Sequence, residues 1–379
     1  MIGTVQKSEQ NAEKNECRIY VKERETIMKK SMKIMSAAMS GIMVLSLAAC
    51  GGSDVGTTAA KDTTEAASEA KDSTDTQAAQ EEKADGEAYT VGICQLVQHD
   101  ALDAATEGFK DAITEALGAD AVTFDEQNAQ GDSNTCSTII NSFVSNDVDL
   151  ILANATAALQ AAQAGTSDIP VLGTSVTEYG VALEIDDFTG TVGSNISGTS
   201  DLAPLDEQAA MLHELFPDAK NVGLLYCSAE ANSQYQVDTV KAALEELGYT
   251  CEYYAFSDSN DLSTIVTNAA GACDVIYVPT DNTAASNTEI INNICQPAGV
   301  PIVAGEEGIC KGCGVATLSI SYYDLGVATG KMAVKILTGE SNVSEMPIEY
   351  APQFTKKYNP AACEALGITV PEGYEAIAE

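Results

Sequence analysis

VGICQLVQHDALDAATEGFKDAITEALG, residues 91–118, contains the pattern that decides the fold. A short apolar run leads into polar residues and then into apolar residues at helical spacing, which end at a glycine. The stretch VGLLYCSAEANSQYQVDTVKAALEELG, residues 222–248, repeats this order 131 residues later. Each stretch predicts a buried β-strand followed by an amphipathic α-helix. In the second helix the apolar residues at three- and four-residue steps are Val237, Val240, Ala243, Leu244 and Leu247.

The repeat continues beyond the first helix of each half. DLILA (149–153) and IPVLGTS (169–175) correspond to DVIYV (274–278) and VPIVAGEE (300–307). Alternation of strands and helices predicts parallel sheets with right-handed crossovers, and about 290 residues are too many for one such core. The sequence therefore predicts an α/β protein made of two doubly wound parallel-sheet lobes.

A different pattern precedes the repeat. A lysine-rich head leads into a short apolar run that ends in Leu-Ala-Ala-Cys at Cys50. This order is typical of a secretion signal, and its last four residues resemble a bacterial lipobox, in which the cysteine carries lipid after cleavage. We expect residues 28–50 to be a lipoprotein signal peptide with Cys50 as the lipid attachment site, and residues 1–27 to be a possible over-extended start. The alternative is a buried apolar helix that ends at an unrelated cysteine.

The segment after the lipobox, residues 51–87, consists mainly of Gly, Ser, Thr, Ala, Asp, Glu and Lys. Such a segment cannot bury enough apolar surface to order itself, so we expect a disordered tether. No later stretch is apolar for 18 residues, and we predict no membrane-spanning helix. The expected location is the cell membrane, where a lipid holds the globular part facing outside.

The chain is strongly acidic, with 19 Lys and Arg residues against 56 Asp and Glu residues. Residues 50–379 retain 11 basic and 51 acidic side chains, a net charge near −40, and contain no arginine. This balance argues against a nucleic acid partner, because phosphate binding depends on clusters of Lys and Arg. A ligand carboxylate would have to bind backbone amides, hydroxyls or a lysine, since no guanidinium group is available.

Nine cysteines follow residue 50, and they are spread through the apolar patterns. Their odd number and positions predict buried thiols rather than a scaffold held together by disulfides. Cys310 and Cys313 form one tight pair, which leaves open structural thiols or a disulfide, a conditional disulfide near a site, or a metal site. A metal site is not expected, because only two histidines, His99 and His213, follow residue 50.

Polar residues follow the predicted strands of both halves. In open α/β sheets, ligands bind at the carboxyl ends of the strands, near the point where the strand order reverses. The first half places hydroxyls, amides and helix starts there, which suit a carboxylate, and the second half adds acidic groups, which suit an ammonium. The candidate ligand-binding residues are Gln95, His99, Thr156, Thr174, Ser175 and Thr177 in the first half, and Glu230, Asn232, Ser233, Asp281, Asn282 and Glu306 in the second.

An α-amino acid carries a carboxylate and an ammonium on one carbon, so we expect this class of ligand. The acidic candidates also have structural interpretations. Asp281 can simply cap the helix that follows it, and Glu230 and Glu306 can be solvated loop charges. His99 can cap a helix or pack its ring, and Thr156 can act only as a cap.

No catalytic motif accompanies these residues. The sequence has no Gly-x-Ser-x-Gly elbow, no phosphate-binding loop that ends in Gly-Lys-Ser/Thr and no Gly-x-Gly-x-x-Gly after a strand. We expect no enzyme activity, no catalytic residue and no cofactor. Because the chain has no tryptophan, an aromatic ligand would need to stack on a tyrosine, such as Tyr226, Tyr235 or Tyr322.

Four stretches resemble the substrate-binding proteins of ABC importers, in particular the group for tryptophan or tyrosine. They are QLVQHDALDAATEGF (95–109), NSQYQVDTVKAALEELG (232–248), YVPTDNT (277–283) and ISYYDLG (320–326). The resemblance covers nearly all of residues 88–379 and implies the type I periplasmic-binding-protein fold, in which three crossover strands form a hinge between the lobes.

The resemblance further implies that residues 193–201 form a crossover and that the helix after Asp324 returns to lobe one. Lobe one is then expected to comprise residues 88–197 and about 316–345, and lobe two residues 202–315 and about 346–379. Ligand contacts are implied for the His99 loop, Thr156, Thr177, Asn232 and Asp281.

The function implied by the resemblance is that of a receptor outside the cell. It would capture a small amino-acid-type ligand, aromatic or branched, by hinge closure and deliver it to an ABC permease with its ATPase. The alternatives are the same role for a nucleoside or sugar, a flavodoxin-like redox protein that uses Cys310 and Cys313, and a ligand-sensing partner of a membrane receptor.

Overall fold

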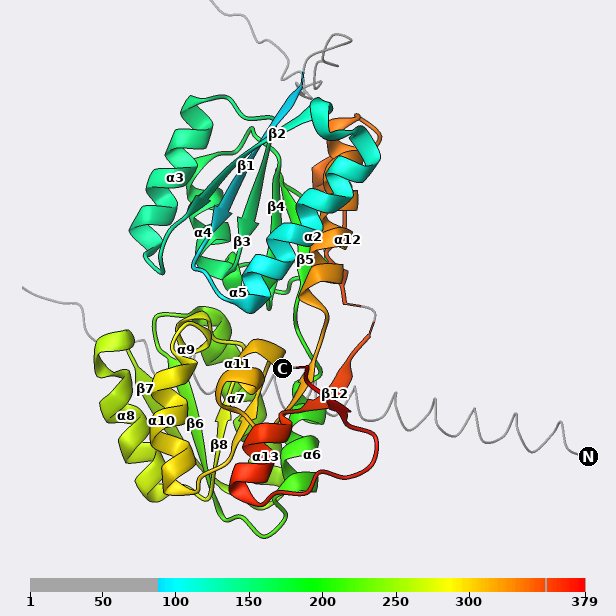
Figure 1. Cartoon of the computed structure of the whole chain (residues 1–379). Coiled ribbons are helices and arrows are strands. Elements are labelled where there is room, and N and C mark those ends of the chain that lie inside the picture. The colour runs from blue at the N-terminus through cyan, green and yellow to red at the C-terminus, as the bar shows by residue number, and fades with distance from the viewer. Residues whose placement is uncertain (1–87, 352, 379) are drawn as a thin grey trace, which may run out of the picture. The chain divides into compact units, whose positions relative to one another are not determined.

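Two β-sheets organise residues 88–351 and 353–378, which are the residues described by this computed structural model (Figure 1). All of them belong to one compact unit. The segments predicted as over-extended start, signal peptide and tether, together with Cys50, lie outside the described residues.

The first sheet has the strand order β11-β5-β4-β3-β1-β2, and its neighbouring strands are all parallel. We call this sheet and its helices lobe one. Its strands are β1 (Tyr89–Gln95), β2 (Val122–Asn128), β3 (Leu150–Asn154), β4 (Val171–Val176), β5 (Ile196–Ser200) and β11 (Glu349–Tyr350). Its helices are α2 (Asp100–Leu117), α3 (Ser133–Ser145), α4 (Thr156–Gly165), α5 (Tyr179–Ala182) and α12 (Tyr322–Leu337), with short 3₁₀ turns η1 (Ala119–Ala121) and η2 (Val343–Glu345).

The second sheet has the order β13-β12-β10-β9-β8-β6-β7 and is parallel except between β10 and β12. We call this sheet and its helices lobe two. Its strands are β6 (Asn221–Cys227), β7 (Thr250–Phe256), β8 (Val275–Val278), β9 (Ile302–Ala304), β10 (Ala316–Ser319), β12 (Thr355–Tyr358) and β13 (Glu375–Ala376). Its helices are α6 (Leu205–Leu215), α7 (Ala231–Glu246), α8 (Ser259–Ala272), α9 (Asn282–Ala285), α10 (Thr288–Ala298), α11 (Glu307–Cys313) and α13 (Pro360–Leu366).

The two sheets follow the same plan. In lobe one the order is β2-β1-β3-β4-β5, and in lobe two it is β7-β6-β8-β9-β10, so the strand order reverses beside β1 and beside β6. This arrangement is the doubly wound topology that the internal repeat predicted, and the prediction of an α/β fold is confirmed.

Within the described residues, the chain passes between the lobes at three places. These lie between β5 and α6, between β10 and α12, and between β11 and β12. The second passage follows Ser319, because β10 is buried and pairs with β9 in the sheet of lobe two. The third follows Tyr350, because β11 still pairs with β5 in the sheet of lobe one.

Helix α12 returns to lobe one and packs against α2, as the resemblance implied. The two helices approach so closely that glycine is required at their contact. A Cβ atom added at Gly326 would lie 2.0 Å from the carbonyl oxygen of Ala105, and one added at Gly108 would lie 2.1 Å from that of Tyr323. The spacing of Gly326 and Gly330 on α12 therefore places two small residues on the face toward α2.

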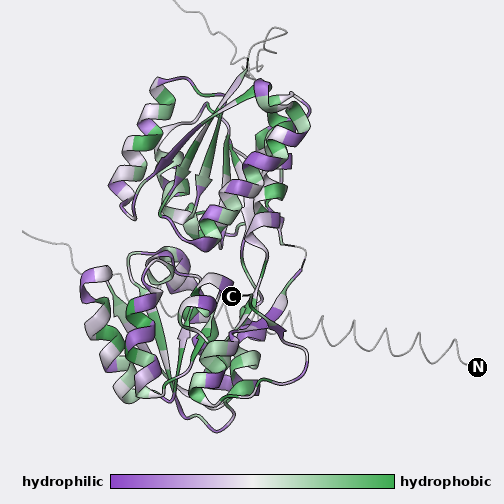
Figure 2. Cartoon of the chain, viewed as in Figure 1, coloured by the Kyte–Doolittle hydropathy of each residue, from purple (hydrophilic) through white to green (hydrophobic). Residues whose placement is uncertain are grey.

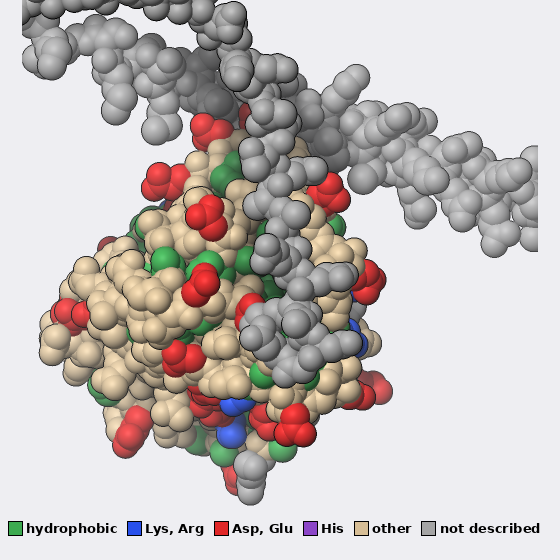
Figure 3. All heavy atoms as spheres, turned by 90° about the horizontal axis from the view of Figure 1, so that it is seen from above, with side chains coloured by type: hydrophobic (Ala, Val, Ile, Leu, Met, Phe, Trp, Pro, Cys, Tyr) green, Lys and Arg blue, Asp and Glu red, His purple; other side chains and the backbone are tan. Residues whose placement is uncertain are grey.

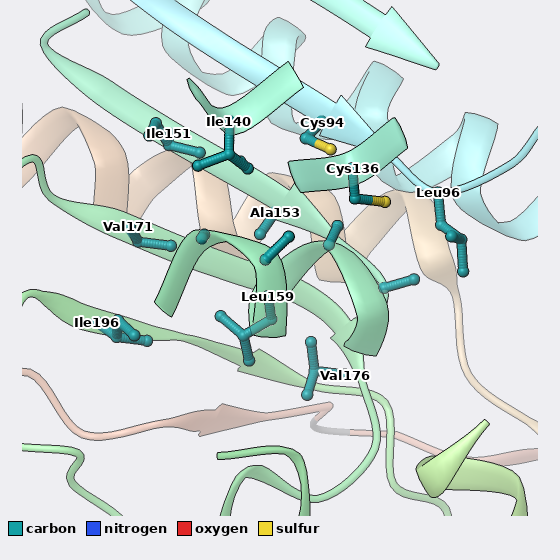
Figure 4. Close-up of a cluster of buried hydrophobic side chains, with 14 of the residues drawn as sticks. Cys94, Leu96, Cys136, Ile140, Ile151, Ala153, Leu159, Val171, Val176 and Ile196 are labelled. Carbon is teal, nitrogen blue, oxygen red and sulfur yellow. The ribbon is translucent and has the colours of Figure 1, made fainter. Parts of the chain in front are cut away.

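Apolar side chains fill the space between each sheet and its helices, and the strands are correspondingly apolar in Figure 2. In lobe one, one core lies under α3 and α4 (Figure 4) and another under α2 and α12.

On the face drawn in Figure 3, acidic side chains are scattered widely and basic ones are few. Among the described residues, no helix is long and apolar enough to cross a membrane.

The cysteines of the described residues are free thiols, and all except the half-buried Cys273 are buried. Cys310 and Cys313 lie three residues apart on α11, and Cys313 Sγ donates a hydrogen bond to the carbonyl of Ile309. The disulfide that their spacing left open is therefore not formed in this structure. The described residues also contain no cluster of three or more His, Cys, Asp or Glu side chains that could hold a metal ion.

Candidate functional site

The loops at the carboxyl ends of the two sheets line a shared pocket, which we call the interlobe pocket. Its volume of about 10 Å³ leaves room for roughly one water molecule. Both lobes and the connection between β5 and α6 contribute to its wall. The lining residues are His99, Leu102, Ser175, Asp201, Asn232, Thr280, Asp281, Asn282, Ala285, Glu306 and Tyr322.

The doubly wound topology explains why these residues meet. His99 follows β1 and Asp281 follows β8, so each lies in a loop beside the reversal of strand order in its own sheet. Ser175 lies in β4 with a φ of 55°, a left-handed conformation that is uncommon for a residue other than glycine. Such strained residues often cluster at binding sites.

A hydrogen bond joins the lobes across the interlobe pocket. His99 Nε2 lies 3.1 Å from Asn282 Oδ1, and Asn282 Nδ2 donates to Glu230 Oε2 at 2.8 Å. Because the amide nitrogen of Asn282 is used in that way, its oxygen is the acceptor and His99 Nε2 carries the proton. Burial lowers the pKa of His99, so the ring is neutral at pH 7 and its Nδ1 is an acceptor.

Asp281 and Glu306 use their carboxylates for the backbone. Asp281 Oδ2 accepts from Cys227 N at 2.7 Å, and its Oδ1 accepts from Ala284 N at 2.8 Å and caps α9. Glu306 accepts from the backbone N–H groups of Gly308 and Ile309 and caps α11. Burial raises the pKa of Asp281 to about 8, helped by the charge of Glu230, and burial raises the pKa of Glu306 to about 7.

Glu230 is also engaged within lobe two. Its Oε2 accepts from the backbone and side-chain nitrogens of Asn282, and its Oε1 accepts from the backbone nitrogen and hydroxyl of Thr283. The carboxylate thus holds the start of α9 against α7 and does not line the interlobe pocket. The three acidic groups of lobe two expected to receive an ammonium have a hydrogen bond on every carboxylate oxygen, because nearby N–H and hydroxyl groups already occupy them.

Asp201 differs from these carboxylates. It lies in the connection between β5 and α6, is only 4% exposed, and accepts a hydrogen bond at Oδ2 from the hydroxyl of Tyr322 at 2.9 Å. Its Oδ1 is buried and has no hydrogen-bond partner. Burial raises the pKa of Asp201, although the Tyr322 and Thr177 hydroxyls oppose the shift.

Unpartnered polar atoms concentrate in the interlobe pocket. Five buried side-chain nitrogen or oxygen atoms of the described residues lack a hydrogen-bond partner. Three of them, His99 Nδ1, Ser175 Oγ and Asp201 Oδ1, belong to pocket-lining residues. A buried polar group without a partner costs free energy, so this concentration marks a place where a polar ligand can bind.

The structure brings half of the predicted binding residues to the interlobe pocket and leaves the others outside its lining. Those that line the interlobe pocket are His99, Ser175, Asn232, Asp281, Asn282 and Glu306; those that do not are Gln95, Thr156, Thr174, Thr177, Glu230 and Ser233. Two of the latter lie next to pocket carboxylates, since the hydroxyls of Thr177 and Ser233 interact with Asp201 and Asp281.

Two of the residues outside the pocket have structural partners in lobe one. Gln95 hydrogen-bonds to Asp103 and Thr106 and lines a separate hollow on the surface of lobe one. Thr174 is fully buried, and its hydroxyl lies 3.3 Å from that of Thr199 and 3.2 Å from that of Thr329. This hydroxyl cluster ties α12 to β4 and β5.

The sequence prediction missed several lining residues, of which Asp201 is the most polar. It directly follows β5, so the rule that polar residues after strands approach the ligand could have found it. Of the tyrosines proposed for stacking, Tyr322 lines the interlobe pocket, whereas Tyr226 lies in the core of lobe two.

Comparison with known proteins agrees with this architecture. Residues 90–379 match the family described as ABC transporter substrate binding protein. The chain is 33% identical over 327 residues to a tyrosine-binding protein of Clostridioides difficile strain R20291, covering 85% of this chain and 88% of that protein.

Solved structures of substrate-binding proteins are also similar to this chain. The structure of an ABC domain from Streptococcus pneumonia in complex with L-Trp has 32% sequence identity to this chain and a TM-score of 0.73. The comparison covers 77% of this chain and 100% of that chain. A ligand-free, open structure of a substrate binding protein with adhesive properties from Clostridium difficile is 36% identical, with a TM-score of 0.59, 76% of this chain and 99% of that chain covered. The branched-chain amino acid binding protein LivJ from Streptococcus pneumoniae, at 14% identity and a TM-score of 0.52 with 68% and 86% coverage, shows the fold alone.

Proposed function

Because the chain belongs to the family of ABC transporter substrate-binding proteins, we propose that it captures an aromatic or branched amino acid outside the cell and delivers it to a membrane permease. The family and the similar structures are solute-binding proteins rather than enzymes, in agreement with the prediction of no enzyme activity. The observation that carries the proposal is a polar pocket built jointly by two lobes.

The similar proteins support an amino acid as the ligand. The tyrosine-binding protein and the complex with L-Trp are both more than 30% identical to this chain over most of its length. The interlobe pocket offers polar groups on both sides together with Tyr322, whose ring could contact an aromatic side chain.

Hinge motion is the proposed capture mechanism. The chain has a higher TM-score with the L-Trp complex than with the ligand-free, open structure, although its identity to the open structure is higher. This difference and the hydrogen bond between His99 and Asn282 support a closed arrangement. A pocket of about 10 Å³ cannot admit an amino acid, so the lobes must part before a ligand enters.

The proposed location rests on the sequence. A lipid on Cys50 would hold the receptor at the outer face of the membrane, and residues 51–87 would tether it near the permease. Replacing Cys50 by Ser should release the protein from the membrane fraction into the medium. Retention of the variant in the membrane fraction would contradict the lipid anchor.

A thermal-shift screen of the full chain against amino acids, nucleosides and sugars tests the ligand class. A ligand present at 100 times its dissociation constant should stabilise the protein by about 2.7 kcal/mol. Asn232→Ala in the interlobe pocket should reduce the shift, whereas Asn268→Ala on the exposed face of α8 should not. If nucleosides or sugars alone raise the melting temperature, the amino-acid assignment fails.

A further inference from the structure

The unpartnered atoms of the interlobe pocket share one chemical property. Asp201 Oδ1 can only accept hydrogen bonds when the carboxyl group is ionised, and His99 Nδ1 can only accept them in the tautomer set by Asn282. The Ser175 hydroxyl can accept as well as donate. A pocket with two free acceptors and one hydroxyl matches a ligand group that has several N–H donors.

We propose that Asp201 Oδ1 is the anchor for the ligand's ammonium group, with His99 Nδ1 and Ser175 Oγ as further acceptors. This assignment rests on the proposed function and deepens it. An ammonium group has three N–H donors and a positive charge, so it satisfies the free acceptors and offsets the buried carboxylate. A neutral hydroxyl of a sugar would provide one donor and no charge.

The competing carboxylates are less suitable because they already bind the protein itself. Asp281 holds Cys227 N and Ala284 N, and Glu306 holds the first N–H groups of α11. Moving either group toward a ligand would break a buried hydrogen bond, with a cost that offsets the gain. A ligand can bind Asp201 Oδ1 without breaking a hydrogen bond, since that atom has no hydrogen-bond partner.

The position of Asp201 also connects the ligand to the hinge. Its Oδ2 bonds to Tyr322, so the residue joins the connection between β5 and α6 to the first residue of α12, where the connection from β10 ends. A ligand held at Oδ1 therefore contacts a residue in one of the segments about which the lobes would move. The assignment moves the ammonium from the carboxylates of lobe two to a residue between the lobes.

A thermodynamic cycle on the full chain separates the ligand's amine from the rest of the ligand. Isothermal titration calorimetry would compare L-tyrosine with 3-(4-hydroxyphenyl)propanoate, which lacks the amine, for the wild-type chain and for Asp201→Asn. The asparagine can keep its oxygen toward Tyr322 and place an NH₂ donor where the free acceptor was. The wild type should prefer L-tyrosine by about 10- to 150-fold, and the variant should lose most of this preference.

Asp281→Asn and Ser175→Ala complete the test. Asn268→Ala on the exposed face of α8 is the control that should retain the preference for the amine, whereas Ser175→Ala should reduce it by about 2- to 10-fold. Asp281→Asn tests the competing carboxylate. If Asp201→Asn does not fold, the test rests on Ser175→Ala, for which the ratio of the dissociation constants of the two compounds is compared with that of the wild type.

The possible failures have different signatures. If the wild type binds L-tyrosine and Asp201→Asn keeps the full preference, or only Asp281→Asn loses it, the assignment of Asp201 is overturned while the proposed function stands. If the wild type binds neither compound, nor L-tryptophan nor L-leucine, the proposed function fails and the assignment fails with it.

Discussion

His99 Nε2 in lobe one and Asn282 Oδ1 in lobe two lie 3.1 Å apart, although 183 residues separate them in the chain. The contact spans the interlobe pocket, in which there is room for about one water molecule. A bond between the lobes stabilises the closed arrangement relative to an open one, because opening separates the two side chains.

Replacing Asn282 by Ala should therefore favour the open arrangement of the ligand-free protein. The loss of one hydrogen bond between the lobes corresponds to about 1 kcal/mol, or roughly a fivefold shift of the equilibrium. Small-angle scattering should record a larger radius of gyration. The control, Asn141→Ala on the exposed face of α3, should scatter like the wild type, and equal radii for all three proteins would disprove the role of the contact.

Stability should fall as the pH rises from about 6.5 to about 8 and should level off above that value. Asp281 and Glu306, whose pKa values are raised to about 8 and about 7, keep protons in the folded state that the unfolded chain releases near pH 4. The folded state then binds more protons, so its stability is lost as the pH rises through these values. The lowered pKa of His99 acts in the opposite direction only below about pH 6.5, outside this range.

Calorimetric melting at pH 6.5, 7.5 and 8.5 checks this dependence. Asp281→Asn cannot ionise and should have a smaller decline in melting temperature than the wild type. The exposed Glu340 provides a control, because Glu340→Gln removes a similar charge without changing a buried carboxyl group. A decline in Asp281→Asn as steep as that of the wild type would show that the acidic surface as a whole, rather than this carboxyl, causes the effect.

Gly326→Ala should destabilise the fold by about 1–3 kcal/mol or more, because its Cβ would lie 2.0 Å from the Ala105 carbonyl oxygen and force α12 away from α2. Gly271→Ala is the matched control within a helix. A Cβ at Gly271 meets no atom, and alanine there should stabilise the protein by about 0.5–1 kcal/mol. Thermal unfolding measures both, and a harmless Gly326→Ala would contradict the close helix packing.

Cys310 and Cys313 should resist alkylation in the native protein. Both thiols are buried, and burial raises the pKa of each far above its usual value, which disfavours the reactive thiolate. Iodoacetamide should modify them only after unfolding, as measured by peptide mass spectrometry. Rapid labelling of the native protein, or a peptide that contains a disulfide between them, would revive the redox alternative.

Local patterns were sufficient for much of the fold. Val237, Val240 and Leu244 recur at helical spacing and are fully buried in α7, because periodicity reports which side of a helix faces the core. Leu247 continued the same pattern but is 44% exposed, since it is the C-cap residue where the helix ends. The repeat predicted the doubly wound sheets because both halves carry the same order of strands and helices.

The position of the site could be predicted from the sequence more easily than the hydrogen bonding of its side chains. His99 and Asp281 follow strands beside the two reversals of strand order, and the pocket lies there. Which carboxylate has a free oxygen depends on partners that are distant in the chain: Asp281 meets Cys227, and Asp201 meets Tyr322.

By itself, the sequence determined the repeated strand and helix order, the acidic surface and the loops that carry the site, because periodicity and charge are properties of neighbouring residues. The tertiary structure alone decided that Gly326 must lack a Cβ, that His99 meets Asn282, and that Asp201 keeps an unpartnered oxygen. Each of these facts depends on groups brought together from distant segments, and hydrogen bonds and close contacts act only over a few ångströms.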